Sequence, residues 1–159
     1  MKFQYKTVLF AVFLFPLLSL GQLTVYSANQ LDSLLYAEQR PLVFFMKTDW
    51  CSICHGMEKV VWNDEEVANV LNESFYFVIF NAESKEDVVF KGKRYIYEPS
   101  GINQGKHQFA MQLAGDKGTI SFPSTVNILG RDKLYHNNSF ISQKDLLYVL
   151  KTIQEAVEE

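Results

Sequence analysis

The stretch Trp50-Cys51-Ser52-Ile53-Cys54 decides how the rest of this sequence is interpreted. It follows an apolar run, Leu42-Val43-Phe44-Phe45-Met46, that is typical of a short buried strand. Residues 51–62 then carry apolar side chains at helical spacing. Two thiols three positions apart at the start of a helix lie on one face, close enough to form a disulfide. The pattern therefore predicts a strand, a Cys-x-x-Cys turn and a helix, in that order.

The two cysteines differ in their expected surroundings. Cys51 begins the helix, where unpaired backbone N–H groups and the positive end of the helix dipole favour a thiolate. A thiolate is the form of cysteine that attacks disulfides. A purely structural bridge is the alternative, since exported proteins commonly contain them. Closing a loop of two residues constrains the unfolded chain very little, however, so the pair is interpreted as redox-active.

Residues 1–21 are typical of an export signal. Lys2 and Lys6 precede an apolar run at 8–20, and a small-x-small cleavage site follows. The run is short for a membrane span, which makes an uncleaved anchor the less favoured alternative. We therefore expect one domain at 22–159 in an exported protein, either periplasmic or secreted.

The charge of the chain limits the partners that it is expected to bind. The 159 residues include 15 Lys and Arg and 18 Asp and Glu. Removal of the signal would leave 13 basic and 18 acidic residues, a net charge of −5. A negative domain is a poor ligand for nucleic acid or for an anionic membrane surface. Neither is therefore expected as a main partner.

The residues around the Cys-x-x-Cys stretch predict alternating strands and helices. Ser27 is the expected N-cap of the first helix, and Asn63, with Glu66 three residues later, that of the third. The order predicts a sheet with parallel pairs covered by helices. The expected elements are strands at 23–26, 42–46 and 75–80, and helices at 27–40, 51–62 and 63–71.

The segment from about 82 to 118 is less regular and is interpreted as an insertion. Lys91-Gly92-Lys93 lies between alternating apolar and polar residues, which predicts a hairpin. Glu98-Pro99-Ser100-Gly101 predicts a turn, and residues 107–114 one or two helical turns. The aromatic residues of the segment are expected to form a satellite core, with a substrate-recognition surface as the alternative.

The last part of the chain returns to regular elements. Residues 120–129 form an apolar run that contains Pro123. Proline cannot donate to a strand ladder, so a strand start, an edge position or a cis bond is expected there. An edge strand at 133–136 and a helix capped by Ser142 with Asp145 complete the pattern.

Together these features resemble the thioredoxin superfamily. The resemblance is carried by Trp50-Cys51-Ser52-Ile53-Cys54 after an apolar strand, by Phe122-Pro123-Ser124-Thr125 further along, and by the β-turn-β-helix ending. Residues 47–64 more narrowly resemble exported bacterial proteins of the disulfide-reductase and isomerase kind. The resemblance implies an α/β thioredoxin fold, a central mixed sheet flanked by helices, with the insertion placed before the cis-proline strand.

The resemblance also implies roles for residues of the site. Cys51 would be the attacking nucleophile and Cys54 the resolving thiol. Pro123 would be the cis proline, and Trp50 and Phe122 would contact the substrate, the latter through main-chain pairing. Implied partners are disulfide-containing proteins or small disulfides, together with a membrane or soluble dithiol donor. No cofactor and no metal are expected.

Two departures from the thioredoxin pattern affect the mechanism. Phe45 stands six residues before Cys51, where thioredoxins carry a buried carboxylate. Glu58, one helical turn after Cys54, is the candidate proton acceptor in its place, and water is the alternative. The dipeptide Ser52-Ile53 matches neither the Gly-Pro of reducing thioredoxins nor the x-His of strong oxidants. Reduction is slightly favoured, from the kind of proteins that the chain resembles.

Two alternatives to a thiol–disulfide oxidoreductase stay open at this point. One is a thioredoxin-fold binding module without catalysis. The other is a c-type haem electron carrier, because Cys51-Ser52-Ile53-Cys54-His55 also matches the haem attachment motif. His55 would then be the proximal iron ligand and Met111 a candidate distal one. A β run before the motif is unlike the mostly helical cytochromes c, and haem leaves Trp50 and Pro123 unexplained.

Overall fold

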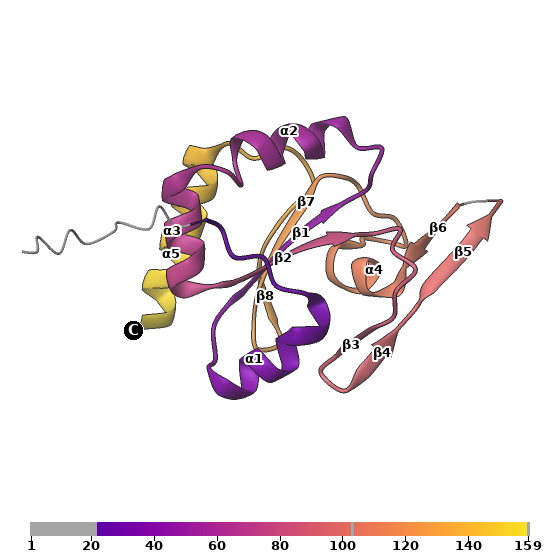
Figure 1. Cartoon of the computed structure of the whole chain (residues 1–159), viewed down its shortest axis with the longest axis horizontal. Coiled ribbons are helices and arrows are strands. Elements are labelled where there is room, and N and C mark those ends of the chain that lie inside the picture. The colour runs from indigo at the N-terminus through magenta and orange to yellow at the C-terminus, as the bar shows by residue number, and fades with distance from the viewer. Residues whose placement is uncertain (1–21, 103, 159) are drawn as a thin grey trace, which may run out of the picture.

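The computed structural model describes residues 22–102 and 104–158, so the export signal expected at 1–21 lies outside it. Its centre is a four-stranded mixed sheet with the order β2-β1-β7-β8 (Figure 1). β1 pairs in parallel with β2 and antiparallel with β7, and β7 pairs antiparallel with the edge strand β8. The strands of this sheet are β1 (Leu42–Lys47), β2 (Tyr76–Asn81), β7 (Ser124–Leu129) and β8 (Asp132–Asn137).

Helices cover both faces of the sheet (Figure 1). α2, α3 and α5 pack on one face, and α1 and α4 pack on the other together with the inserted strands. Within the described residues, no helix combines the length and the apolar character needed to cross a membrane. The helices are α1 (Leu31–Ala37), which follows a 3-10 turn at Ala28–Gln30, α2 (Ser52–Val60), α3 (Glu65–Ser74), α4 (Gln108–Ala114) and α5 (Gln143–Glu158).

β1 is buried on both faces, which explains its unbroken apolar sequence. Because successive side chains of a strand point to opposite faces, β1 contributes to two cores. Val43 and Phe45 face the redox-side core, which also contains both cysteines and residues of α2, α3 and α5. Phe44 and Met46 face the insertion-side core, which contains residues of α1 and α4.

The inserted segment between β2 and β7 folds as two hairpins followed by α4. The first hairpin turns at Lys91 and Gly92, which both have positive φ, the conformation that glycine adopts without steric cost. Phe109 of α4 lies at the centre of an aromatic cluster, with ring centroids 5.2 Å from Phe80 and 5.6 Å from Phe44. The strands are β3 (Val88–Phe90), β4 (Lys93–Tyr95), β5 (Tyr97–Gly101) and β6 (Gln104–His107).

The structure corrects four of the expected local features. Residues 23–26 form no strand, although the Tyr26 N–H donates to the Phe77 carbonyl at 2.8 Å. Asp64, not Asn63, caps α3, because its carboxylate reaches the N–H of Val67 at 3.0 Å. The expected turn at 98–101 belongs to β5, where Pro99 is tolerated beside a register shift in a two-stranded hairpin. The expected satellite core is continuous with the insertion-side core.

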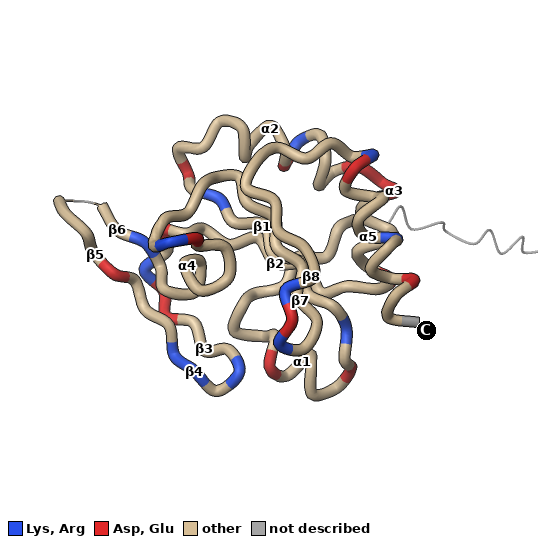
Figure 2. The backbone as a smooth tube through the Cα atoms, turned by 180° about the vertical axis from the view of Figure 1, so that it is seen from behind, with Lys and Arg blue, Asp and Glu red and all other residues tan. Residues whose placement is uncertain are grey.

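Basic and acidic residues are interspersed along the backbone (Figure 2). Both signs occur in the inserted segment and in the helices on the opposite face of the sheet. Several form ion pairs, such as Lys151 with Glu66 at 2.7 Å and Arg94 with Asp87. The mixture agrees with a formal net charge of only −3 for the whole chain.

His107 is a buried imidazole at the N-terminus of α4. Its Nδ1 accepts the N–H of Phe109 at 3.0 Å, so Nε2 carries the proton and donates to the Glu86 carbonyl at 3.0 Å. Burial lowers the pKa of His107, against smaller opposing effects of the Glu86 carbonyl and Asp87. The neutral ring thus satisfies both of its polar partners.

This arrangement predicts that the protein loses stability on mild acidification. The unfolded chain takes up a proton on His107 near pH ~6.5, whereas the folded chain resists it, so the free energy of unfolding falls as the pH drops below about 6.5. Burial lowers the pKa of His136 as well, and its effect has the same sign. Urea unfolding at pH about 7.5 and about 5.5 should show the loss, and His107→Gln should reduce it. Equal stability of the unaltered protein at both pH values would contradict the assignment.

Candidate redox site

Cys51 and Cys54 form a disulfide at the start of α2, with an S–S distance of 2.06 Å and Cα atoms 5.2 Å apart. Cys51 is the N-cap residue of the helix. The structure thus confirms the predicted order of strand, Cys-x-x-Cys turn and helix. The side chains of both cysteines belong to the redox-side core, and Cys54 is completely buried.

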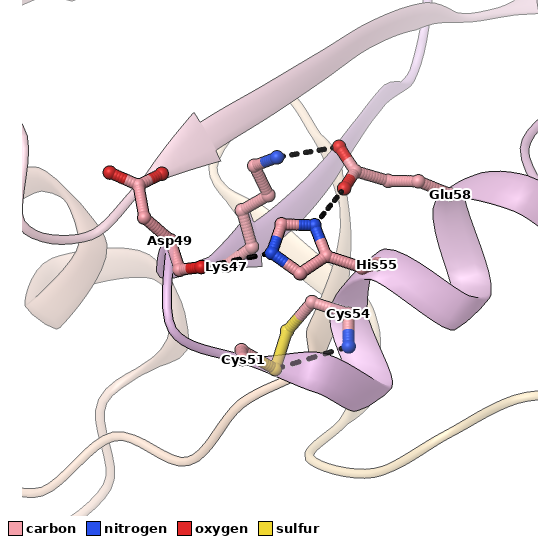
Figure 3. A network of polar contacts seen from close by, with 6 residues as sticks. All are labelled: Lys47, Asp49, Cys51, Cys54, His55 and Glu58. Carbon is pink, nitrogen blue, oxygen red and sulfur yellow. Dashed lines mark hydrogen bonds and ion pairs between the residues drawn. A yellow bond between two sulfur atoms is a disulfide. The ribbon is translucent and has the colours of Figure 1, made fainter.

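The backbone of α2 distinguishes the two sulfurs. The N–H of Cys54 donates to Sγ of Cys51 at 3.1 Å (Figure 3). The same N–H would point at a thiolate on Cys51 after reduction and would stabilise it, together with the helix dipole. Cys54 lies one turn further into the helix, and its side chain has no surface exposed to solvent. The geometry favours Cys51 as the sulfur that meets a partner.

A second polar network lies beside the disulfide (Figure 3). Lys47 at the end of β1 forms an ion pair with Oε1 of Glu58 at 2.6 Å. Oε2 of Glu58 lies 3.3 Å from Nδ1 of His55, and Nε2 of His55 lies 2.9 Å from the carbonyl oxygen of Asp49. Both oxygens of the Glu58 carboxylate are therefore occupied. The network ties α2 to the loop that precedes Cys51.

Trp50 and Phe122 lie together at the exposed rim of the site. Their rings meet edge to face with centroids 6.1 Å apart. Phe122 packs against the redox-side core that contains both cysteines, and the peptide bond from Phe122 to Pro123 is cis, as the sequence pattern predicts. The fold thus places Trp50 beside the Phe122–Pro123 segment, although the two are distant in sequence.

Glu83 and Lys106 also belong to this site, although sequence reasoning did not identify them. The indole N–H of Trp50 donates to both oxygens of Glu83, at 3.1 and 3.2 Å. Lys106 Nζ lies 2.7 Å from Oε1 of Glu83. Burial alone would raise the pKa of Glu83, but the hydrogen bonds from Lys106 and Trp50 outweigh it and hold that pKa below its ordinary value. Glu83 is therefore an ionised partner for both.

A signal for Glu83 was present in the sequence. β1 and β2 run parallel, with Lys47 opposite Asn81, so the residues just after both strands meet at one edge of the sheet. Trp50 follows β1 and Glu83 follows β2, which places them together. Lys106 arrives through the inserted hairpin β5–β6, and its place depends on long-range packing that no local pattern encodes.

A protein-family model described as thioredoxin-like matches residues 30–101 of the chain. Over these residues the chain is similar to thioredoxin-like proteins. A search of curated proteins gave no match.

Solved structures share the thioredoxin fold with this chain. A thioredoxin from Thermus thermophilus is 14% identical, with a TM-score of 0.60, over 87% of this chain and 94% of its own. A structure described as DsbH oxidoreductase is 15% identical, with a TM-score of 0.57, over 84% and 85% of the two chains. A thioredoxin-fold protein from Helicobacter pylori is 16% identical, with a TM-score of 0.55, over 75% and 71%. These likenesses establish the fold.

The thioredoxin fold places the remaining sequence-predicted residues. Phe45 is fully buried in the redox-side core, with its ring centroid 5.2 Å from that of Trp62. An apolar contact thus occupies the position where thioredoxins carry the carboxylate. Met111, the candidate distal haem ligand, belongs to α4, which packs on the opposite face of the sheet from Cys51 and Cys54. That placement does not support it as a partner of His55.

The side chains that commonly bind metal ions do not cluster in the part of the chain that the structure describes. No group of three or more His, Cys, Asp or Glu side chains gathers there in a way that could hold an ion.

Proposed function

We propose that this protein is a thiol–disulfide oxidoreductase that works through Cys51 and Cys54, with reduction of its substrates slightly favoured over oxidation. The observation that carries the proposal is the Cys51–Cys54 disulfide at the N-terminus of α2, with the Cys54 N–H aimed at Sγ of Cys51. The thioredoxin fold and the exposed side chain of Trp50, the residue before Cys51, support it.

The reaction uses the difference between the two sulfurs. In the reduced protein the Cys51 thiolate attacks one sulfur of a substrate disulfide, and the other substrate sulfur leaves as a thiolate. Cys54 then loses its proton and attacks the Cys51 sulfur of the mixed disulfide. This step restores the Cys51–Cys54 bond and releases the second substrate thiolate. Two electrons pass from the cysteine pair to the substrate, and a dithiol donor restores the pair.

Two further residues have proposed roles in this cycle. Glu58 is proposed to accept the Cys54 proton, supported by its place one turn after Cys54 on α2. Its pairing with Lys47 and His55 holds the carboxylate on the helix that carries the motif, with the Glu58 side chain 25% exposed. Glu58→Gln should then slow exchange with little effect on substrate KM, and an unchanged rate would assign the proton to water.

Backbone groups of Phe122 are proposed to pair with the substrate main chain, beside Pro123.

The compartment and the partners follow from the sequence pattern. Residues 1–21, typical of an export signal, support an exported protein, periplasmic or secreted in a bacterium. An oxidising compartment supplies disulfide substrates, and a reductive role there requires electrons from a membrane or soluble dithiol donor. The substrates are disulfide-containing proteins or small disulfides.

A turnover assay tests the proposed function. With dithiothreitol as the donor, the protein is expected to speed the reduction of insulin disulfides in proportion to its concentration. Equilibration with glutathione buffers should give a single two-electron transition for the Cys51–Cys54 pair, whose midpoint decides the direction of exchange. A cysteine pair that stays oxidised in the buffers and a rate equal to that of dithiothreitol alone would instead favour the non-catalytic binding module.

A further inference from the structure

The hairpin β5–β6 reaches the redox site through the side chain of Lys106. Lys106, on β6, places its ammonium 2.7 Å from Glu83, 5.5 Å from the ring centre of Phe122 and 6.0 Å from that of Trp50. In Figure 1 the inserted strands lie on the same side of the molecule as the loop that leads into α2. One cation thus touches a carboxylate and two aromatic rings that come from three different parts of the chain.

The contacts of Trp50 and Glu83 fix the orientation of the indole. A hydrogen bond to an ionised acceptor is stronger than one between neutral groups. Glu83 and Lys106 are each about one-third exposed, so solvent screens their attraction less than that of a fully exposed pair (side-chain exposure 31% and 34%). Lys106 adds a cation–π contact to the ring that Glu83 already holds. Without the pair, only Phe122 would contact the ring of Trp50 among these residues.

The surface that Trp50 offers is apolar. Trp50 is 67% exposed and Ile53 is 55% exposed, and these two side chains flank Cys51 in sequence on either side. Large apolar groups left in water beside a reactive sulfur indicate a binding surface for an apolar partner. They would cover the side chain next to a cysteine in a bound polypeptide.

The charges near the site disfavour a small anionic disulfide. Lys106 is paired with Glu83, and Lys47 is paired with Glu58, so neither ammonium is left without a counter-charge. Asp49, one residue before Trp50, adds an exposed carboxylate. Glutathione disulfide carries a net negative charge and little apolar surface. It is therefore expected to bind only weakly beside Trp50.

We propose that Glu83 and Lys106 are positioning residues that hold Trp50 for the binding of polypeptide disulfides with an apolar residue beside the cysteine. The pair contacts no reacting sulfur and acts through the indole. The inference rests on the proposed function and adds to it the substrate class and the role of the insertion.

Steady-state kinetics on two substrates test the inference. The substrates are a disulfide-linked peptide with an apolar residue beside each cysteine, and glutathione disulfide. Lys106→Met and Glu83→Gln are expected to raise KM for the peptide by about 5- to 10-fold, as for the net loss of one hydrogen bond, with kcat unchanged. Neither variant should change kcat/KM for glutathione disulfide. Lys106→Arg keeps the charge and should retain most of the affinity for the peptide.

Two further measurements separate positioning from a general loss of structure. Arg94→Met removes the other ion pair of the inserted segment, Arg94–Asp87, and should leave both substrates unaffected. The indole N–H signal of Trp50, assigned with Trp50→Phe, should shift in the NMR spectrum of Lys106→Met and Glu83→Gln but not in that of Arg94→Met.

The possible failures are distinct. An unchanged KM, an equal rise of KM for both substrates, or the same effect in Arg94→Met would overturn the inference while the proposed function stands. If the unaltered protein exchanged with neither disulfide, the proposed function would be wrong and the inference would fall with it.

Discussion

Cys54→Ser is expected to accumulate covalent complexes between Cys51 and its substrates, whereas Cys51→Ser should form few and lose activity. In Cys54→Ser, Cys51 keeps the N–H of residue 54 and the helix dipole, so it still attacks. The mixed disulfide then has no neighbouring thiol to resolve it. Because an intramolecular thiol acts at a very high effective concentration, turnover should fall by about 10³-fold or more. Non-reducing electrophoresis and mass spectrometry would detect the complexes.

Alkylation of the reduced, unaltered protein is an independent measure of the same difference. At mildly acidic pH, iodoacetamide should label Cys51 first, because its thiolate is stabilised and its pKa should fall below the free value of about 8.5. Cys54 is completely buried and should react slowly. Faster labelling of Cys54, or equal trapping of substrates by the two serine variants, would show that the two roles are assigned the wrong way round.

Phe109→Ala should lower the free energy of unfolding by about 3–5 kcal/mol, the range for removal of a fully buried phenylalanine. The ring meets four aromatic neighbours edge to face within the insertion-side core, and their relaxation can fill only part of the space left behind. The neighbours are Phe44, Phe80, Phe90 and Tyr95. Urea unfolding followed by circular dichroism measures the change.

Ile102→Ala is the matched control for this change in stability. Ile102 lies at the tip of the inserted hairpin with 93% of its surface exposed, so truncation removes almost no buried contact. Its free energy of unfolding should stay within about 0.5 kcal/mol of that of the unaltered protein. If Phe109→Ala were as mild as Ile102→Ala, the insertion would not be part of the core that the sheet needs.

Strong periodic patterns predicted much of this fold. The unbroken apolar run of β1, the helical spacing after Cys51 and the capping signal at Ser142 each agree with the burial that the fold imposes. The N-cap of α3 and the structure around Pro99 depended on three-dimensional contacts that the sequence pattern does not contain. Asn63 and Asp64 are both good caps, and the bond to Val67 decided between them. Pro99 is typical of a turn, but an edge strand also tolerates proline.

The site was predictable where its residues are close in sequence or belong to a family pattern. Cys51 and Cys54 follow from the motif, and the cis bond before Pro123 is confirmed. The roles assigned to Trp50 and Phe122 stay predictions. Lys106 could not be predicted, because its contacts with Glu83 depend on how a hairpin inserted far from the motif packs against the sheet.

The continuity of the inserted segment with the insertion-side core has a consequence for how this protein can change. The insertion-side core contains Phe44 of the central sheet together with Phe90, Tyr95 and Phe109 of the inserted segment. Lys106 lies only three residues before Phe109. The residues proposed to shape the substrate surface are thus anchored by the residues that hold the fold together. Trimming the segment to a short loop would remove α4 and the inserted strands from one face of the sheet and leave α1 there. Changes to the proposed substrate surface are therefore limited to those that the core also tolerates.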